Sequence, residues 1–159
     1  MGLKSLHQTN GQEQWRWCAL GDKWQTIASL YVSLEVGEIW HVIAEAFGRN
    51  DIGRDTGDTV NVSFSTRVLA CLNVPCFYGH SIRSNESVIC VAYGTNIMPE
   101  RHYDSQARHR HWEVPKTGDY WVQLQVRVSS KPLREGAIEF WPEQQLLSMV
   151  RLGGIFSTA

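Results

Sequence analysis

The stretch Tyr-Trp-Val-Gln-Leu-Gln-Val-Arg-Val, residues 120–128, decides the fold class of this chain. Its side chains alternate between an apolar set and a mostly polar set. A period of two places successive side chains on opposite faces of a β-strand, so that one face can be buried. The stretch therefore predicts an antiparallel strand whose buried face is formed by Tyr120, Val122, Leu124 and Val126. The opposite face carries Trp121, and we expect Gln123 and Gln125 there to lie outside the apolar core.

Shorter apolar or alternating runs recur along the rest of the chain, and they occupy residues 30–36, 39–45, 60–65, 88–93, 138–141 and 146–152. Segments rich in Gly, Asn, Asp, Ser and Pro separate them, as expected of turns. No segment shows a long helical period with caps, and a strand is favoured over a helical turn in residues 144–150. Many short strands separated by turns predict an all-β antiparallel sandwich or barrel. We expect residues 1–23 to form an N-terminal arm and residues 24–159 to form this domain.

The composition is that of one globular domain. The chain has 159 residues, of which 43% are hydrophobic and 19% are charged, with a formal net charge of -1. This balance provides no electrostatic attraction for nucleic acid or for an anionic membrane, so neither is expected as a partner. No apolar run approaches the roughly 20 residues of a membrane-spanning helix. The polar residues 1–14 lack an apolar signal core, so we expect synthesis in a cytoplasm without secretion through a cleaved signal.

The four cysteines form no Cys-x-x-Cys pair and show no zinc-finger spacing. Cys90 lies in an apolar run, where cysteine behaves as a small hydrophobic residue. Cys71 and Cys76 flank a turn at Pro75 and could approach each other. Because proteins without secretion signals usually keep their thiols reduced, we expect Cys71 and Cys76 to be thiols and not a disulfide.

The segment Val-Pro-Lys-Thr-Gly-Asp-Tyr-Trp-Val, residues 114–122, resembles a segment of C1q/TNF-like jelly rolls, in which a similar turn leads into a long core strand. Here Gly118 permits the turn and Tyr120 begins the inward face. The resemblance implies a jelly-roll β-sandwich that assembles as a homotrimer. Such domains serve as secreted ligands in animals and as capsid decoration, head-fibre or receptor-binding parts in bacteriophages. The polar N-terminus departs from the secreted pattern and is compatible with a virion protein.

Aromatic and basic residues outside the expected core are candidates for contacts with partners. Trp121 lies on the polar face of the strand, so it belongs under a loop, in a subunit interface or on a sugar-binding platform. We take Trp121, Gln123 and Gln125 as candidates for the trimer interface. Trp15 and Trp17 are candidates for anchoring the arm to a shell. A basic and aromatic loop over residues 101–112 offers candidate contacts to a partner or glycan through Arg101, Tyr103, Arg108, Arg110 and Trp112.

His109 and His111 are the best candidates for metal ligands. Residues two apart in a strand share a face, so both imidazoles could reach one ion. His41 and His80 are distant in the sequence and could be ligands of the same ion only if the fold brings them close to His109 and His111. Cupins also use a His-x-His pair, but their following glutamate lies farther away than Glu113 does here. We therefore favour a polar loop over a metal site, and expect no bound metal and no cofactor.

These observations favour an assembly role over catalysis. The chain has no Gly-x-Ser-x-Gly elbow, no phosphate-binding loop and no dinucleotide-binding fingerprint, so we do not expect an enzyme. The first hypothesis is a virion structural protein: a homotrimeric capsid decoration (cement) or head-fibre protein that binds the major capsid protein or another virion protein. The second is a carbohydrate-binding or receptor-binding module. The third is a metal-dependent, cupin-like enzyme, which would need an ion at His109 and His111.

Overall fold

A computed structural model describes residues 5–8, 16–18, 24–50, 61–76, 83–97, 103–131, 138–140 and 145–153 of the chain, and its side chains over 24–48, 64–76, 83–91, 109–127 and 145–153. Every regular element in these ranges is a β-strand. The strands are β1 (Ser5–Gln8), β2 (Arg16–Cys18), β3 (Gln25–Leu34), β4 (Ile39–Asn50), β5 (Asn61–Leu72), β6 (Glu86–Ile97), β7 (Tyr103–Glu113), β8 (Gly118–Lys131), β9 (Ile138–Phe140) and β10 (Leu146–Gly153).

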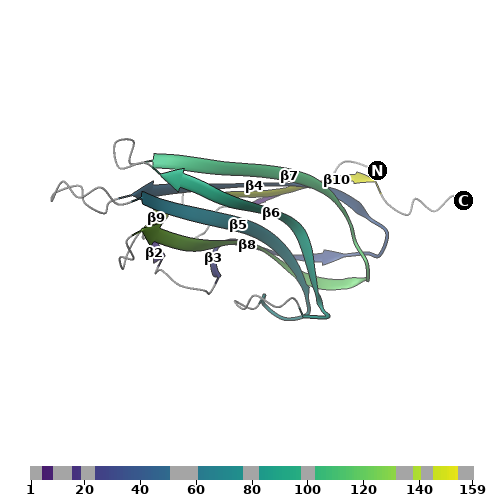
Figure 1. The fold of residues 1–159 in the computed structure, drawn as a ribbon. Coiled ribbons are helices and arrows are strands. Elements are labelled where there is room, and N and C mark those ends of the chain that lie inside the picture. The colour runs from purple at the N-terminus through teal and green to yellow at the C-terminus, as the bar shows by residue number, and fades with distance from the viewer. Residues whose placement is uncertain are drawn as a thin grey trace, which may run out of the picture.

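The strands form two antiparallel sheets that pack face to face (Figure 1). The four-stranded sheet has the order β3-β8-β5-β6. The six-stranded sheet has the order β1-β10-β4-β9-β2, with β7 paired to the other side of β4. The chain is thus a jelly-roll β-sandwich, which confirms the predicted fold class. No helix long and apolar enough to cross a membrane occurs in the described ranges.

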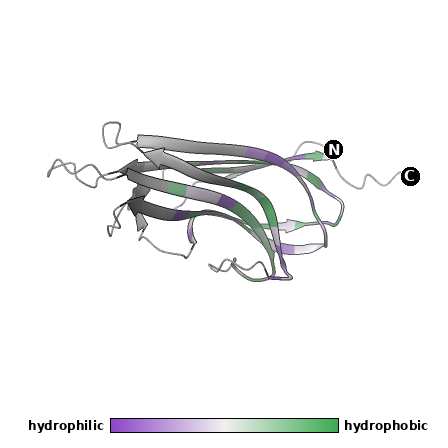
Figure 2. Cartoon of the chain, in the orientation of Figure 1, coloured by the Kyte–Doolittle hydropathy of each residue, from purple (hydrophilic) through white to green (hydrophobic). Residues whose placement is uncertain are grey.

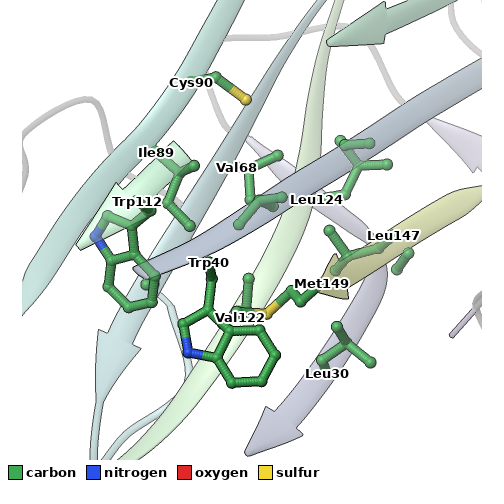
Figure 3. Close-up of a cluster of buried hydrophobic side chains, with 14 of the residues drawn as sticks. Leu30, Trp40, Val68, Ile89, Cys90, Trp112, Val122, Leu124, Leu147 and Met149 are labelled. Carbon is green, nitrogen blue, oxygen red and sulfur yellow. The ribbon is translucent and has the colours of Figure 1, made fainter. Parts of the chain in front are cut away.

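The strand predicted from residues 120–128 lies in the centre of the four-stranded sheet. β8 pairs along its length with β3 on one side and with β5 on the other. Tyr120, Val122, Leu124 and Val126 are at most 1% exposed, which confirms the predicted inward face. Figure 3 shows Val122 and Leu124 in one cluster with Trp40 of β4 and Met149 of β10, so the main core is formed by both sheets.

The turn between β3 and β4 is held by a buried carboxylate. Gly37 adopts a φ of 86°, a conformation that glycine reaches without strain. Glu38 accepts a hydrogen bond from the backbone N–H of Glu35, and its Oε2 lies 3.1 Å from Nε of Arg151. Glu38 is only 6% exposed, so this ion pair joins the turn to β10 inside the protein. The carboxylate of Glu38 therefore has a structural role.

Gly118 is needed for space rather than for a special backbone conformation. Among the described glycines, Gly37 is the one with positive φ, so the expected conformational role of Gly118 is wrong. A Cβ at Gly118 would lie 2.5 Å from Cδ1 of Leu72, because β8 begins directly beside the end of β5. The turn is closed instead by the Tyr120 hydroxyl, which donates a 2.6 Å hydrogen bond to the carbonyl of Lys116.

Residues 101–112 were expected to form a loop, and this expectation is wrong for most of the segment. β7 pairs with β4 from Glu113 to Tyr103 and forms an edge strand of the six-stranded sheet. The hydrophobic alternation that marks the other strands is absent because Arg110, two residues before Trp112 and on the same side of the strand, is polar and remains exposed at the sheet edge. The described part of β7 accordingly forms a hydrophilic stretch (Figure 2).

The segment expected as an arm contributes two short strands to the six-stranded sheet. β1 pairs with β10, and β2 pairs with β9. The other residues before Trp24 lie outside the described ranges. The division into an arm over 1–23 and a domain over 24–159 stays a prediction.

Candidate functional site

An aromatic pair lies on the outer face of the four-stranded sheet. Tyr31 of β3 and Trp121 of β8 are direct cross-strand neighbours, and their ring centroids are 4.8 Å apart. Tyr31 is 59% exposed, whereas Trp121 is half-buried. Beside them, the Ser33 hydroxyl donates a hydrogen bond to the carboxylate of Asp119. The outer face therefore presents an aromatic surface bordered by polar groups.

The other side of Trp121 packs on a second, small hydrophobic cluster. Leu69, Cys71 and Cys76 form this cluster, which is separate from the main core. The backbone N–H of Cys76 donates a 3.0 Å hydrogen bond to Oε1 of Gln123. Gln123 is therefore buried and satisfied within its own chain, so its assignment to a trimer interface is corrected. A loop partly covers Trp121, as one of the sequence-based alternatives proposed.

Cys71 and Cys76 form a disulfide, so the expectation of two thiols is wrong. Their Cα atoms are 5.4 Å apart, a separation that suits a disulfide. The expectation relied on the redox state of a compartment, whereas the turn through Asn73 brings the two residues together. The Glu86 carboxylate lies close by, but the sulfurs of a disulfide are not the thiolates that bind metal ions.

A buried polar network lies farther along the same outer face. Gln125 is 0% exposed, and its Oε1 accepts a 2.8 Å hydrogen bond from Nε of Arg67. The Arg67 guanidinium also lies 4.5 Å from the centroid of the Trp24 ring. Gln125 therefore points away from the main core, as predicted, but it is not available to a second subunit. Only the pairing of β5 with β8 reveals Arg67 as its partner.

Three histidines meet on the outer face of the six-stranded sheet. His41 of β4 is the direct cross-strand neighbour of His111 on β7, and His109 lies two residues before His111. His41 Nε2 is 3.1 Å from His109 Nδ1, and the ring centroids of His41 and His111 are 5.0 Å apart. Partial burial lowers the pKa of His41, and the nearby His111 and His109 lower it further, so the neutral imidazole is favoured.

Of the other predicted contact residues, the structure describes the side chains of Trp112 and Arg110. Trp112 is 8% exposed and packs edge-on against Tyr120 in the main core, so its assignment as a contact residue is corrected. Arg110 is exposed. Tyr103 and Arg108 lie on β7 and Trp17 lies on β2, but their side chains are not described; Arg101, Trp15 and His80 are outside the described ranges.

Comparison with known proteins supports the fold. No protein-family model and no curated protein sequence matches the chain. The structure of Eiger TNF from S. frugiperda is similar over 99% of this chain and 97% of its own, with a TM-score of 0.54 and 10% identity. A chain of infectious bursal disease virus, Gt strain, is similar over 97% of this chain, with a TM-score of 0.50 and 11% identity.

The Gx strain of the same virus is similar over 98% of this chain, with a TM-score of 0.50 and 8% identity. This chain spans about a third of the length of the matched virus chains, at 33% and 35%. Its sandwich is similar in fold to Eiger TNF and to the matched virus chains. At these identities the likeness extends to the fold alone.

Proposed function

We propose that this protein is a virion structural protein, a homotrimeric capsid decoration or head-fibre protein that binds and stabilises the shell. Its partners would be two further copies of itself and the major capsid protein or another virion protein. It would be made in the host cytoplasm and act on the capsid surface. The jelly-roll fold supports this role, since the same fold occurs in the matched virus chains and the residues 114–122 resemble trimeric C1q/TNF-like domains.

The exposed aromatic pair carries the proposal. Tyr31 exposes 59% of its surface directly beside Trp121, whose other side is already supported by the Leu69 cluster. Val88, which is paired with Leu69 and is 43% exposed, continues the apolar character of this outer face. Aromatic residues on a rigid support are enriched at the energetic centres of interfaces. This face is therefore our candidate for the contact between subunits.

Two of the three residues first assigned to that contact have other roles. Gln123 and Gln125 are engaged inside the chain, whereas Trp121 retains part of its surface. The proposed interface is accordingly formed by Tyr31 and Trp121, with Val88 at its edge. Because Tyr31 contributes only its exposed side chain, its replacement tests the interface with little effect on the core.

Light scattering coupled to size-exclusion chromatography tests the assembly. We expect a mass three times the 18.1 kDa of the chain at micromolar concentration. Tyr31→Glu should shift the protein to the monomer, since a charge would be buried at the subunit contact. Val36→Glu is the matched control, because Val36 is 44% exposed in the turn after β3 and away from the aromatic pair. A wild-type mass of one chain, unchanged on dilution, would eliminate the trimer.

The same aromatic pair favours a second candidate function, a carbohydrate-binding or receptor-binding module. Adjacent Tyr and Trp rings form a surface against which a sugar ring can pack, and Ser33 and Asp119 offer polar groups beside it. Titration of the purified protein with oligosaccharides, followed through Trp fluorescence, separates the two roles. A saturable change that is lost in Tyr31→Ala, in a protein that is monomeric, would favour the binding module over the subunit contact.

A further inference from the structure

The three histidines of β4 and β7 have no role in the proposed assembly, yet they lie together on one small area of the surface. The six-stranded sheet places them on its outer face because Val42 and Trp112 are buried on its inner face. A slip of one residue in the pairing would turn these apolar side chains toward solvent, so the core determines the register. The same register sets His41 directly opposite His111.

The separation between two of the three histidines suits a shared ligand. His41 Nε2 and His109 Nδ1 are 3.1 Å apart. Two nitrogens that each bind one zinc ion at about 2.0–2.1 Å lie roughly 2.9–3.4 Å from each other. The third ring, His111, has its centroid 5.0 Å from that of His41, on the strand that also carries His109. The ring nitrogens of the three histidines do not all lie within 4.8 Å of one another, so the exposed His111 ring must turn to another rotamer to complete the site.

We propose that His41, His109 and His111 bind a divalent transition-metal ion such as Zn²⁺ on the outer face of the six-stranded sheet, with water in the remaining coordination position. Imidazole nitrogens are preferred ligands of zinc, copper and nickel, and three histidines with one open position are a known zinc ligand set. Two ligands come from one strand and the third from its neighbour, so the backbone hydrogen bonds between β4 and β7 keep the three residues side by side.

The surroundings leave the site accessible. His109 and His111 are exposed and His41 is partly exposed, so an ion can enter from solvent and the rings can adjust their rotamers. On the other side of His41 lies Val150 of β10, which supplies no ligand. Glu113 is exposed two residues after His111 and adds a negative charge to this end of β7. The site does not depend on the oligomeric state, since one chain provides all three histidines.

The expectation of no bound metal was based on two histidines in a loop. The structure changes both premises, because His109 and His111 lie on a strand and a third histidine joins them. His41 is 68 residues away from His109 in the sequence, so no local motif could indicate the cluster.

Isothermal titration calorimetry with ZnCl₂ on the untagged, disulfide-intact protein tests the site. We expect saturable binding of one ion per chain. His41→Gln and His109→Gln should each weaken it at least about 10-fold, since even a change in the second coordination shell costs that much. Arg110→Gln is the matched control, because Arg110 lies between the two histidines of β7 but on the opposite side of the strand. The zinc affinity of this variant should equal that of the wild type.

Nuclear magnetic resonance of the histidine rings provides a readout that needs no variant. On addition of ZnCl₂ the ring signals of His41, His109 and His111 should shift together, while those of His7, His80 and His102 should not. Absence of saturable binding would overturn the proposal, as would zinc binding that is unchanged in both His→Gln variants. An equal loss in Arg110→Gln would also overturn it, because the effect would then not depend on the imidazoles.

Discussion

Nε of Arg67 donates a 2.8 Å hydrogen bond to Oε1 of Gln125, across the pair of β5 and β8 and on the side of the sheet opposite the main core. Both side chains are buried, at 4% and 0% exposed. Gln125 also donates a 3.2 Å hydrogen bond from Nε2 to Oγ1 of Thr26, and Trp24 packs on the guanidinium. The cation thus contacts a neutral amide and an aromatic ring inside the protein.

Gln125→Leu should destabilise the protein by about 1–3 kcal/mol, because it removes a buried acceptor of the Arg67 cation. The double variant Arg67→Met with Gln125→Leu should lose less stability than the two single variants lose in sum. In the double variant neither polar group is left buried without its partner. Urea unfolding of the four proteins measures this coupling. Strict additivity would mean that Arg67 and Gln125 do not depend on each other.

Leu124→Ala should lower the free energy of unfolding by about 2–5 kcal/mol, because Leu124 is fully buried at the centre of β8 and its removal leaves a cavity. Leu152→Ala is the same substitution at a residue of β10 that is 46% exposed, and it should change the free energy by no more than about 0.5 kcal/mol. Thermal and urea unfolding compare the two. Equal effects would mean that the inward face of β8 is misassigned.

Gly118→Ala should cost about 1–3 kcal/mol, because the added Cβ meets Cδ1 of Leu72 and a packed neighbour must move. In a Leu72→Ala background the same substitution should cost less, since the obstructing methyl group is absent. Urea unfolding of the double-mutant cycle provides the measurement. If Leu72→Ala brings no relief, the cost comes from the backbone of the turn and not from the contact.

Tyr120→Phe should cost about 0.5–1.5 kcal/mol at neutral pH, because it removes the hydrogen bond to the carbonyl of Lys116. Tyr31→Phe is the control at an exposed tyrosine, and it should leave the stability unchanged.

The loss in Tyr120→Phe should also depend on pH. Burial raises the pKa of Tyr120 above its usual value near 10. In the wild type, the neutral Tyr120 hydroxyl contributes fully to the stability at pH values below the pKa that Tyr120 has in the unfolded chain. This contribution is lost as the pH rises through the higher pKa that Tyr120 has in the folded protein. The difference in stability between the wild type and Tyr120→Phe should therefore shrink above about pH 10. A difference that is constant from pH 7 to pH 11 would contradict this account.

Local pattern predicted the central strands well. The inward face of β8, the end of β3 before Gly37 and the strand β10 all follow from side chains that alternate or cluster along a few residues. β7 was missed because an edge strand can leave an inward residue such as Arg110 exposed, so its alternation of polarity is weak. The disulfide was missed because the expectation was based on the compartment and not on the geometry of the turn.

The sequence by itself determined the all-β class, the buried face of β8 and the presence of a polar and aromatic set outside the core, since each depends on neighbours along the chain. Only the tertiary structure decided which members of that set meet. Pairing of distant strands buries Gln125 against Arg67, exposes Tyr31 beside Trp121, places Trp112 in the core and brings His41 to His109. The physical reason is that strand register is set by the burial of the whole apolar face, which no single segment contains.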